Sequence, residues 1–387
     1  MTVPFDYRPV TRVIYGAGSF RQLGEVAAEF GNRTVLLVTD PGLKAAGHSE
    51  TAVAALAASG LKVAVFDEVA ANPTTNDVDR CVEFAESRDV GLIVGLGGGS
   101  SMDCAKGANF LLTNGGEMAQ YRGIGKATRP MLPMIAVPTT AGTGSEAQSF
   151  AVIADPVTHM KMACGDRKAA CRVAILDPEL TVTMPRFVAA ATGIDAMTHA
   201  IESYVTTRRN SVSQMFARTG WELLSGAFPI VLSDPGNIEA RGRMLLGAHM
   251  AGAAIENSML GATHAMANPL TAQFNMVHGI AVGVMLPHVI RWNAVDVAGL
   301  YHDLAVTANW ASSTDSQDQA VEALAVGFTG LLQHADLPVD LTTAVGEEPA
   351  AEKLHALAED AAKQWTGTFN PRRMDAESFL EVYRNAL

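Results

Sequence analysis

The fold of the first half of the chain is decided by residues 91–103, with the sequence GLIVGLGGGSSMD. The apolar run at residues 91–96 is typical of a buried strand, and three glycines after it open a helical stretch. Similar strand-like runs occur at residues 34–40, 62–67 and 134–137. Amphipathic stretches lie between such runs, at residues 43–59 and 76–87. This alternation predicts an α/β domain with a Rossmann-like parallel sheet that helices cover on both faces.

Two loops lie where such a sheet binds ligands, beyond the carboxyl ends of its strands. Gly97, Gly98 and Gly99 allow close approach of the backbone, and the helix that follows offers free N–H groups to a phosphate. The second loop, residues 138–146 (PTTAGTGSE), carries hydroxyls that suit a diphosphate or a ribose. A tight strand-to-helix turn and a Ser/Thr-rich turn are the alternatives, since neither GxGxxG nor the Walker spacing is present. The two loops together favour a dinucleotide.

Asp40 follows the first apolar run and bears on the choice of dinucleotide. A carboxylate at a strand end accepts hydrogen bonds from an adenosine ribose and repels a 2′-phosphate, which favours NAD over NADP. The segment Asp40-Pro41-Gly42 also has good helix-capping and turn chemistry, so capping remains the alternative interpretation.

Length and composition exclude several classes of protein. A chain of 387 residues exceeds one ordinary core, so we expect two domains. The formal net charge of −12 argues against a nucleic-acid partner. We see neither a signal peptide nor an apolar stretch of about 18 residues, and thus expect no membrane span. Four cysteines without metal-type CxxC spacing predict reduced thiols in a cytoplasmic protein.

After residue 182 the strand pattern stops and helical periodicity continues to the end of the chain. We therefore predict an NAD-binding α/β domain at residues 1–182 and an all-helical, metal-binding domain at residues 183–387. The expected helices of the second domain lie near residues 187–205, 211–230, 236–257, 260–267, 297–310, 317–335, 349–364 and 375–386. Pro269 should end or kink its helix, which would put His264 and His278 on different elements.

A set of candidate metal ligands lies in this second domain. Asp195 and His199 are four residues apart in a helical run, so both side chains emerge from one face. His264 and His278 follow in a segment of small residues with little charge. One carboxylate and three imidazoles suit a divalent transition metal, although each histidine alone is more often a hydrogen-bonded core or surface residue.

Four segments, GGGSSMDCAK, PTTAGTGSE, GIDAMTHAIESY and HAMANPL…HG, resemble the iron-containing (group III) alcohol dehydrogenase family in order and spacing. The resemblance covers nearly the whole chain and ends in residues 369–372 (FNPR). It implies an enzyme that moves hydride between NAD(H) and a small alcohol or aldehyde at a divalent metal, Fe²⁺ with Zn²⁺ as the alternative. It also implies a homodimer or larger homo-oligomer.

Site residues are carried over from the family position by position. The metal ligands would be Asp195, His199, His264 and His278. The cofactor contacts would be Asp40, Asn72, Gly97, Gly98, Gly99, Ser100, Asp103, Thr139, Thr140, Thr143 and Lys161. The metal would lower the pKa of the alcohol oxygen and polarise a carbonyl for the reverse reaction.

The chain departs from the family pattern in its expected substrate pocket. Asn268 stands where many relatives have a second histidine, and an amide carries no proton at neutral pH. Phe150 and Ile255 are apolar, which favours a substrate with few hydroxyls. The pocket would therefore lack a histidine-based proton relay at residue 268.

Two related activities are the alternatives. Maleylacetate reductase resembles this chain but works without a metal, and retention of Asp195 and His199 argues against it. A lyase of the dehydroquinate synthase type needs Lys and Arg residues that grip a phosphate, and the segments with the metal ligands contain almost none.

Overall fold

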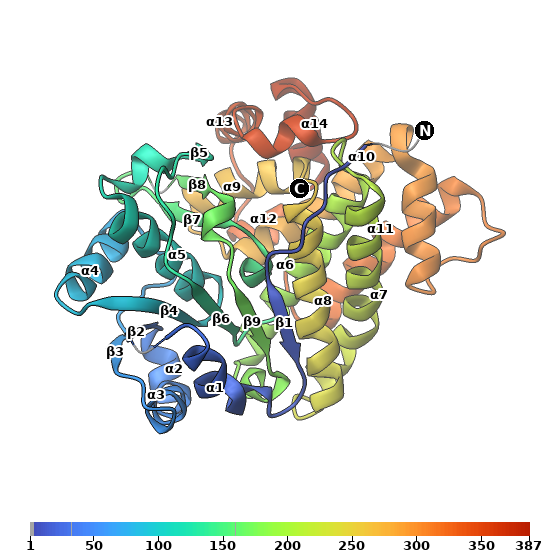
Figure 1. Cartoon of the computed structure of the whole chain (residues 1–387). Helices are drawn as coiled ribbons and strands as arrows, with labels where there is room; N and C mark the ends of the chain where they lie inside the picture. The colour runs from blue at the N-terminus through green and yellow to red at the C-terminus, as the bar shows by residue number, and fades with distance from the viewer. Residues whose placement is uncertain (1–3, 32, 159) are drawn as a thin grey trace. The chain divides into compact units, whose positions relative to one another are not determined.

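The computed structural model describes residues 4–31, 33–158 and 160–387. The chain divides into two compact units, each described separately below. The first is Arg8–Met184, and the second comprises Pro185–Leu387 with residues 4–7. In Figure 1 the first unit is coloured blue to green, and residues 185–387 of the second unit run from green to red.

The first unit is built on a parallel sheet of six strands. In spatial order the strands are β1 (Arg12–Tyr15), β9 (Val173–Leu176), β6 (Met134–Pro138), β4 (Val90–Gly97), β2 (Thr34–Val38) and β3 (Val63–Phe66). The predicted α/β class with a parallel sheet is therefore confirmed. A second sheet of three strands, which the sequence pattern did not reveal, contains β5 (Gly123–Ile124), β8 (Lys161–Gly165) and β7 (Phe150–Ala154).

Five helices accompany the large sheet. They are α1 (Leu23–Ala28), α2 (Pro41–Ala45), α3 (His48–Ala58), α4 (Thr75–Glu86) and α5 (Gly99–Asn114). In Figure 1, α4 and α5 lie on one face of the sheet, and α1, α2 and α3 lie on the other. The single helix expected at residues 43–59 is two helices, because Gly47 takes a left-handed φ of 80° between them.

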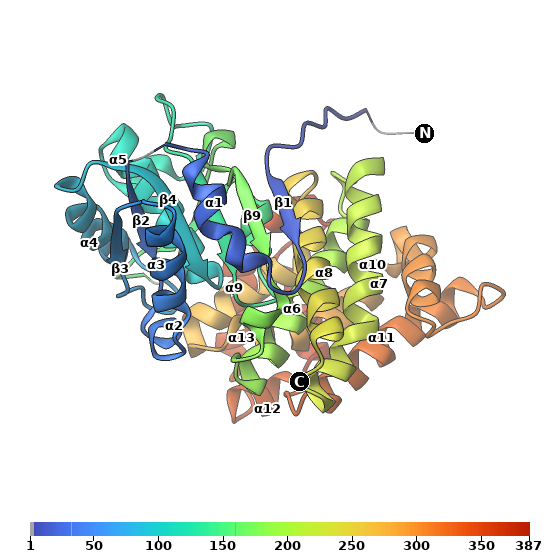
Figure 2. The ribbon, with the colours of Figure 1, turned by 60° about the horizontal axis from the view of Figure 1, so that its bottom comes forward.

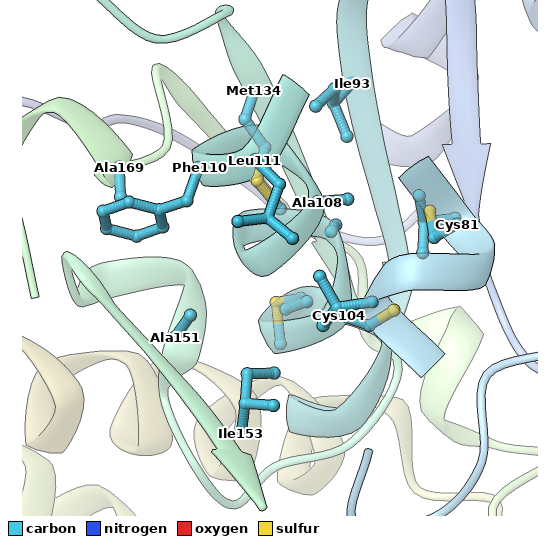
Figure 3. Packing of buried hydrophobic residues seen from close by; sticks show 14 of the residues in the cluster. Cys81, Ile93, Cys104, Ala108, Phe110, Leu111, Met134, Ala151, Ile153 and Ala169 are labelled. Atoms are coloured by element: carbon cyan, nitrogen blue, oxygen red, sulfur yellow. The ribbon is translucent and has the colours of Figure 1, made fainter. Parts of the chain in front are cut away.

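Successive side chains of each strand point to opposite faces of the sheet, so buried residues lie on both faces. On β2, Leu36 and Val38 join the buried cluster under α4 and α5, whereas Val35 and Leu37 join the cluster under α1 and α3. Figure 3 shows part of the first cluster, where Cys104 and Ala108 of α5 pack near Ile153 and Ile93. Burial on both faces explains why these strands are nearly continuous apolar runs.

The second unit is helical, and no strand occurs in residues 185–387, all of which the structure describes. Its helices are α6 (Arg186–Val205), α7 (Ser211–Ser233), α8 (Ile238–Glu256), α9 (Ala262–Phe274), α10 (His278–Thr307), α11 (Gln317–His334), α12 (Leu341–Val345), α13 (Ala351–Ala362) and α14 (Ala376–Asn385). Figure 2 shows α6, α7 and α8 side by side. The predicted all-helical domain is confirmed.

Two helix boundaries of this unit differ from the predictions. Helix α9 continues through Pro269 to Phe274, so this proline does not end the helix. Helix α10 begins at His278, well before the predicted start near residue 297, where a non-helical φ of −136° at Val297 instead kinks the helix. Helix α10 also contains a proline, Pro287. Both prolines are buried, and packing around them offsets the lost backbone hydrogen bond. His264 and His278 nevertheless lie on different helices, as expected.

Among the described residues, one helix, α10, is long and apolar enough to cross a membrane by length and composition. In its most apolar window, of mean hydropathy 1.2, 61% is buried inside the protein. A core helix of a soluble protein has the same character, so α10 is weak evidence for a membrane span.

Candidate functional site

Three helices of the second unit bring the four predicted metal ligands together. Nε2 of His199 lies 3.3 Å from Oδ1 of Asp195, one turn earlier on α6. Nε2 of His264, from α9, lies 3.5 Å from the same oxygen, and Nε2 of His278, the first residue of α10, lies 3.9 Å away. The rings of His199 and His264 stack with centroids 4.8 Å apart. One carboxylate and three imidazoles thus converge on one point.

The buried oxygen and nitrogen atoms at this point could act as ligands of a cation. Asp195, His199 and His264 each offer a ligand atom, and these atoms all lie within 4.8 Å of one another. Within the described part of the chain, Oδ1 of Asp195 and Nε2 of His264 have no hydrogen-bond partner. A bound cation would remove the cost of burying these two atoms. The donor set suits iron or zinc, so these residues fit the metal that the sequence predicts.

The charges of the site also favour a cation. Burial alone would raise the pKa of Asp195, but the imidazoles of His199, His264 and His278 bring it below its ordinary value. Burial lowers the pKa of His264, whereas Asp195 and Glu202 raise it, with a net pKa of about 9. Two buried carboxylates therefore require positive charge between them, which a proton or a metal ion can provide.

Glu202, which the sequence analysis missed as a site residue, orients His264. The Nδ1–H of His264 donates to Oε2 of Glu202 at 2.6 Å, which leaves Nε2 facing Asp195. The backbone N–H of Thr263 donates to Oε1 at 2.6 Å, and that of Gly261 donates to Oε2 at 3.2 Å. Glu202 therefore caps the amino end of α9 and fixes the ring that α9 carries. Its position seven residues after Asp195, on the same helical face, was the available signal.

Two buried asparagines hold the same helix end. The backbone N–H of Ala262 donates to Oδ1 of Asn370 at 3.2 Å, and the side-chain amide of Asn293 donates to the same oxygen at 3.0 Å. In return, Nδ2 of Asn370 donates to Oδ1 of Asn293 at 2.7 Å. Asn370 belongs to the family-like segment 369–372, whereas nothing in the sequence indicated Asn293.

A close approach of two backbones sets the position of His278. A Cβ added to Gly279 would lie 2.0 Å from the carbonyl oxygen of Ala191 on α6. Only glycine allows this distance between α10 and α6. The approach puts the first residue of α10 beside Asp195.

In the first unit, the glycine loop and the threonine loop pack against each other. Gly97 pairs with Pro138 in the register of β4 and β6, and the N–H of Thr139 donates to the carbonyl of Gly97 at 3.1 Å. A Cβ on Gly98 would lie 3.1 Å from Oγ1 of Thr140. A Cβ on Gly99 would lie 2.7 Å from Cγ2 of Thr143. Both loops therefore need these glycines at the carboxyl edge of the sheet.

Other predicted cofactor contacts gather at the same edge. Oδ1 of Asp40 caps α2 by accepting from the N–H groups of Gly42 and Leu43, as the capping interpretation expected. Its Oδ2 accepts from Oγ of Ser101 at 3.2 Å. The N–H of Asn72, whose φ is 53°, donates to Oγ of Ser100 at 3.3 Å.

The last two predicted cofactor contacts, Asp103 and Lys161, lie on α5 and on the three-stranded sheet. Asp103 is partly buried on α5, and Oγ of Ser145 donates to its Oδ1 at 2.6 Å. Burial raises the pKa of Asp103, and the nearby Lys106 opposes this shift. Lys161 is the first residue of β8 and pairs with Ala154 of β7.

The three predicted pocket residues are divided between the units. Phe150 begins β7 in the first unit, where its ring covers Gly165 so closely that a Cβ there would lie 2.3 Å from it. Ile255 is buried on α8 in the second unit. Nδ2 of Asn268, on α9 of the same unit, donates to Oε1 of Gln364 at 3.1 Å.

Comparison with known proteins extends these observations over both units. Residues 10–178 match the family model described as iron-containing alcohol dehydrogenase, and residues 189–387 match that of its C-terminal domain. The chain belongs to the iron-containing alcohol dehydrogenase family. The predicted class, an alcohol and aldehyde oxidoreductase of this metal- and NAD-using family, is thereby confirmed.

Individual relatives of this alcohol dehydrogenase span its full length. It is 32% identical to the NAD-dependent methanol dehydrogenase of Bacillus methanolicus over 374 residues, which cover 97% of each chain. The solved structure of a 1,3-propanediol oxidoreductase matches with a TM-score of 0.95 and 32% identity, and all of each chain is covered. Sulfoacetaldehyde reductase from Bifidobacterium kashiwanohense, in complex with NAD⁺, matches with a TM-score of 0.89 and 26% identity over 99% of each chain.

Proposed function

We propose that this enzyme transfers hydride between NAD(H) and a small alcohol or aldehyde, with a divalent metal as Lewis acid. The metal ligands in this proposal are Asp195, His199, His264 and His278, and the metal is Fe²⁺, with Zn²⁺ as the alternative. The observation that carries the proposal is the buried Oδ1 of Asp195, which lies within 3.9 Å of three imidazole nitrogens.

Each part of the metal site has a separate task. A bound divalent ion would supply Lewis acidity toward the substrate oxygen. Glu202 holds the proton of His264 on Nδ1, so that Nε2 presents its lone pair to the site. Burial of Asp195 and His264 excludes water from that side of the site.

The cofactor part of the proposal rests on the edge of the sheet. The amino end of α5 offers free N–H groups to the diphosphate, and Gly97, Gly98 and Gly99 let it approach. Oδ2 of Asp40 retains acceptor capacity for a ribose hydroxyl, and the negative charge disfavours NADP. The further proposed contacts are Asn72, Ser100, Asp103, Thr139, Thr140, Thr143 and Lys161.

The substrate in this proposal is set by three residues of the expected pocket. Phe150 and Ile255 would favour a short alcohol with few hydroxyls, such as those named for the relatives above. Asn268 donates its amide to Gln364 and holds no exchangeable charge, so it would not serve as a proton relay. The proton released by the alcohol then leaves by a route that avoids residue 268.

We further propose a cytoplasmic homodimer or larger homo-oligomer. Strand β1 is at one end of the six-stranded sheet, and its residues Val13 and Tyr15 are 41% and 46% exposed. An edge strand with exposed apolar residues is usually covered by another chain or segment.

The test uses metal-free protein and short alcohols and aldehydes with NAD(H) and NADP(H). We expect no turnover without metal, recovery with Fe²⁺ or Zn²⁺, and a preference for NAD(H), all followed by NADH absorbance. Full activity on maleylacetate after exhaustive chelation would instead assign maleylacetate reductase. Turnover of a phosphorylated sugar acid without net NADH would assign a lyase.

A further inference from the structure

A buried lysine lies beneath the two loops of the first unit and has no role in the function proposed so far. Lys106, on α5, is 0% exposed. Its ammonium group donates to the carbonyl of Ser145 at 2.6 Å, to Oγ of Ser145 at 2.8 Å, and to the carbonyls of Gln148 and Phe150 at 2.8 and 2.9 Å. All four acceptors lie in residues 145–150, which continue the threonine loop.

The charge of Lys106 is balanced by Asp103, one turn earlier on α5. Oγ of Ser145 accepts from Lys106 and donates to Oδ1 of Asp103 at 2.6 Å, so this hydroxyl bridges the two charges. An ammonium group is costly to bury even when it is fully hydrogen-bonded, and an apolar residue often gives equal stability. Stability alone therefore does not explain a lysine here.

Hydrogen bonds connect the acceptors of Lys106 to Thr143, the residue that packs against the glycine loop. Gln148, whose carbonyl Lys106 holds, donates its side-chain amide to the carbonyl of Thr143 at 2.7 Å. The N–H of Ser145 donates to Oγ1 of Thr143 at 3.3 Å, and Thr143 packs against Gly99 at the start of α5. One side chain on α5 thus connects the helix that opens with the glycine loop to the segment that ends the threonine loop.

We propose that Lys106 is a positioning residue for the dinucleotide, which locks residues 145–150 and hence Thr143 into the arrangement that binds NAD. This inference rests on the proposed function, in which the carboxyl edge of the six-stranded sheet binds NAD. Lys106 does not touch the cofactor in this account. It sets the spacing between two loops that do, and it reaches Phe150 of the expected substrate pocket through that residue's carbonyl.

The test compares Lys106→Met and Lys106→Ala with Leu56→Ala. Leu56 is buried on α3 in the other core cluster, so its truncation destabilises the same unit away from both loops. We expect the Kd for NAD, measured by calorimetry, to rise about tenfold or more in both Lys106 variants, as for other misplaced binding groups. Leu56→Ala should lower the unfolding temperature and leave that Kd within about twofold of wild type.

Chemical rescue separates positioning from structural support. Propylammonium matches the three methylene groups and the ammonium group that Lys106→Ala removes, so it should lower the Kd for NAD again. Neutral 1-propanol, which has the same number of heavy atoms, should not. A Kd unchanged in both Lys106 variants, or raised equally by Leu56→Ala, would overturn the proposal. Absence of NAD binding by the wild-type protein would instead refute the proposed function, and the role of Lys106 with it.

Discussion

Substitution of Gly279 by alanine tests whether backbone contact seats the metal ligand His278. The new Cβ would lie 2.0 Å from the carbonyl oxygen of Ala191, whereas ordinary contacts begin at 3.4 Å. The two helices must therefore separate by about 1.4 Å at this point. His278, the preceding residue, would move away from Asp195, from which its Nε2 now lies 3.9 Å.

The consequence for metal binding follows from the narrow range of metal–ligand distances. These distances vary by only about 0.2 Å in protein sites, so a shift several times larger removes His278 from the ligand set. Even displacement of an outer-shell partner costs 10- to 100-fold in affinity, so we expect a loss of about 100-fold or more. Fe²⁺ and Zn²⁺ titrations against a competing chelator measure this loss.

Gly330→Ala is the matched control for this substitution. Gly330 lies inside α11, and an added Cβ there meets nothing within 4 Å. Alanine in that helix should leave metal affinity unchanged and raise the free energy of unfolding by about 0.5–1 kcal/mol. If folded Gly279→Ala bound metal as tightly as wild type, the assignment of His278 as a ligand seated by Ala191 would be refuted.

Three further predictions concern other parts of the protein. Glu202→Gln should lower metal affinity about 10- to 100-fold, because both carboxylate oxygens accept N–H groups and an amide NH₂ must face one of them; chelator competition measures this, and unchanged affinity would contradict it. Gly99→Val should abolish NAD binding but preserve metal binding, since even a Cβ would lie 2.7 Å from Thr143; calorimetry with each ligand checks both parts. Burial raises the pKa of Cys164 and of Cys171 to about 11, so at about pH 8 almost no thiolate forms, and an alkylating reagent should modify them only after denaturation. Mass spectrometry that finds either one modified in the native protein would count against this.

The main architecture followed from sequence because its strands are buried on both faces. Apolar runs such as those of β2 and β4 left little choice except a parallel sheet. Strands β7 and β8 were not predicted, because each is a segment of only five residues in which buried and half-buried positions alternate, so it resembles a loop. Helix α9 passes Pro269 because tertiary packing outweighs the local cost of proline, which no local pattern reveals.

The candidate site could be predicted only where chemistry and spacing coincide. Asp195 and His199 were visible as a helical pair, and the linked motifs added His264 and His278. Glu202 was missed because its partners are backbone N–H groups and a ring from a distant segment, about sixty residues away. Lys106 was visible only as part of a helix, since its four acceptors depend on the path of residues 145–150.

The most direct test of the central claim is X-ray absorption spectroscopy of the protein loaded with one equivalent of Fe²⁺. Three imidazoles and one carboxylate oxygen should appear in the first coordination shell, and His264→Ala should reduce the imidazole count to two. A shell without three imidazoles in the wild-type protein, or one that His264→Ala leaves unchanged, would contradict the account.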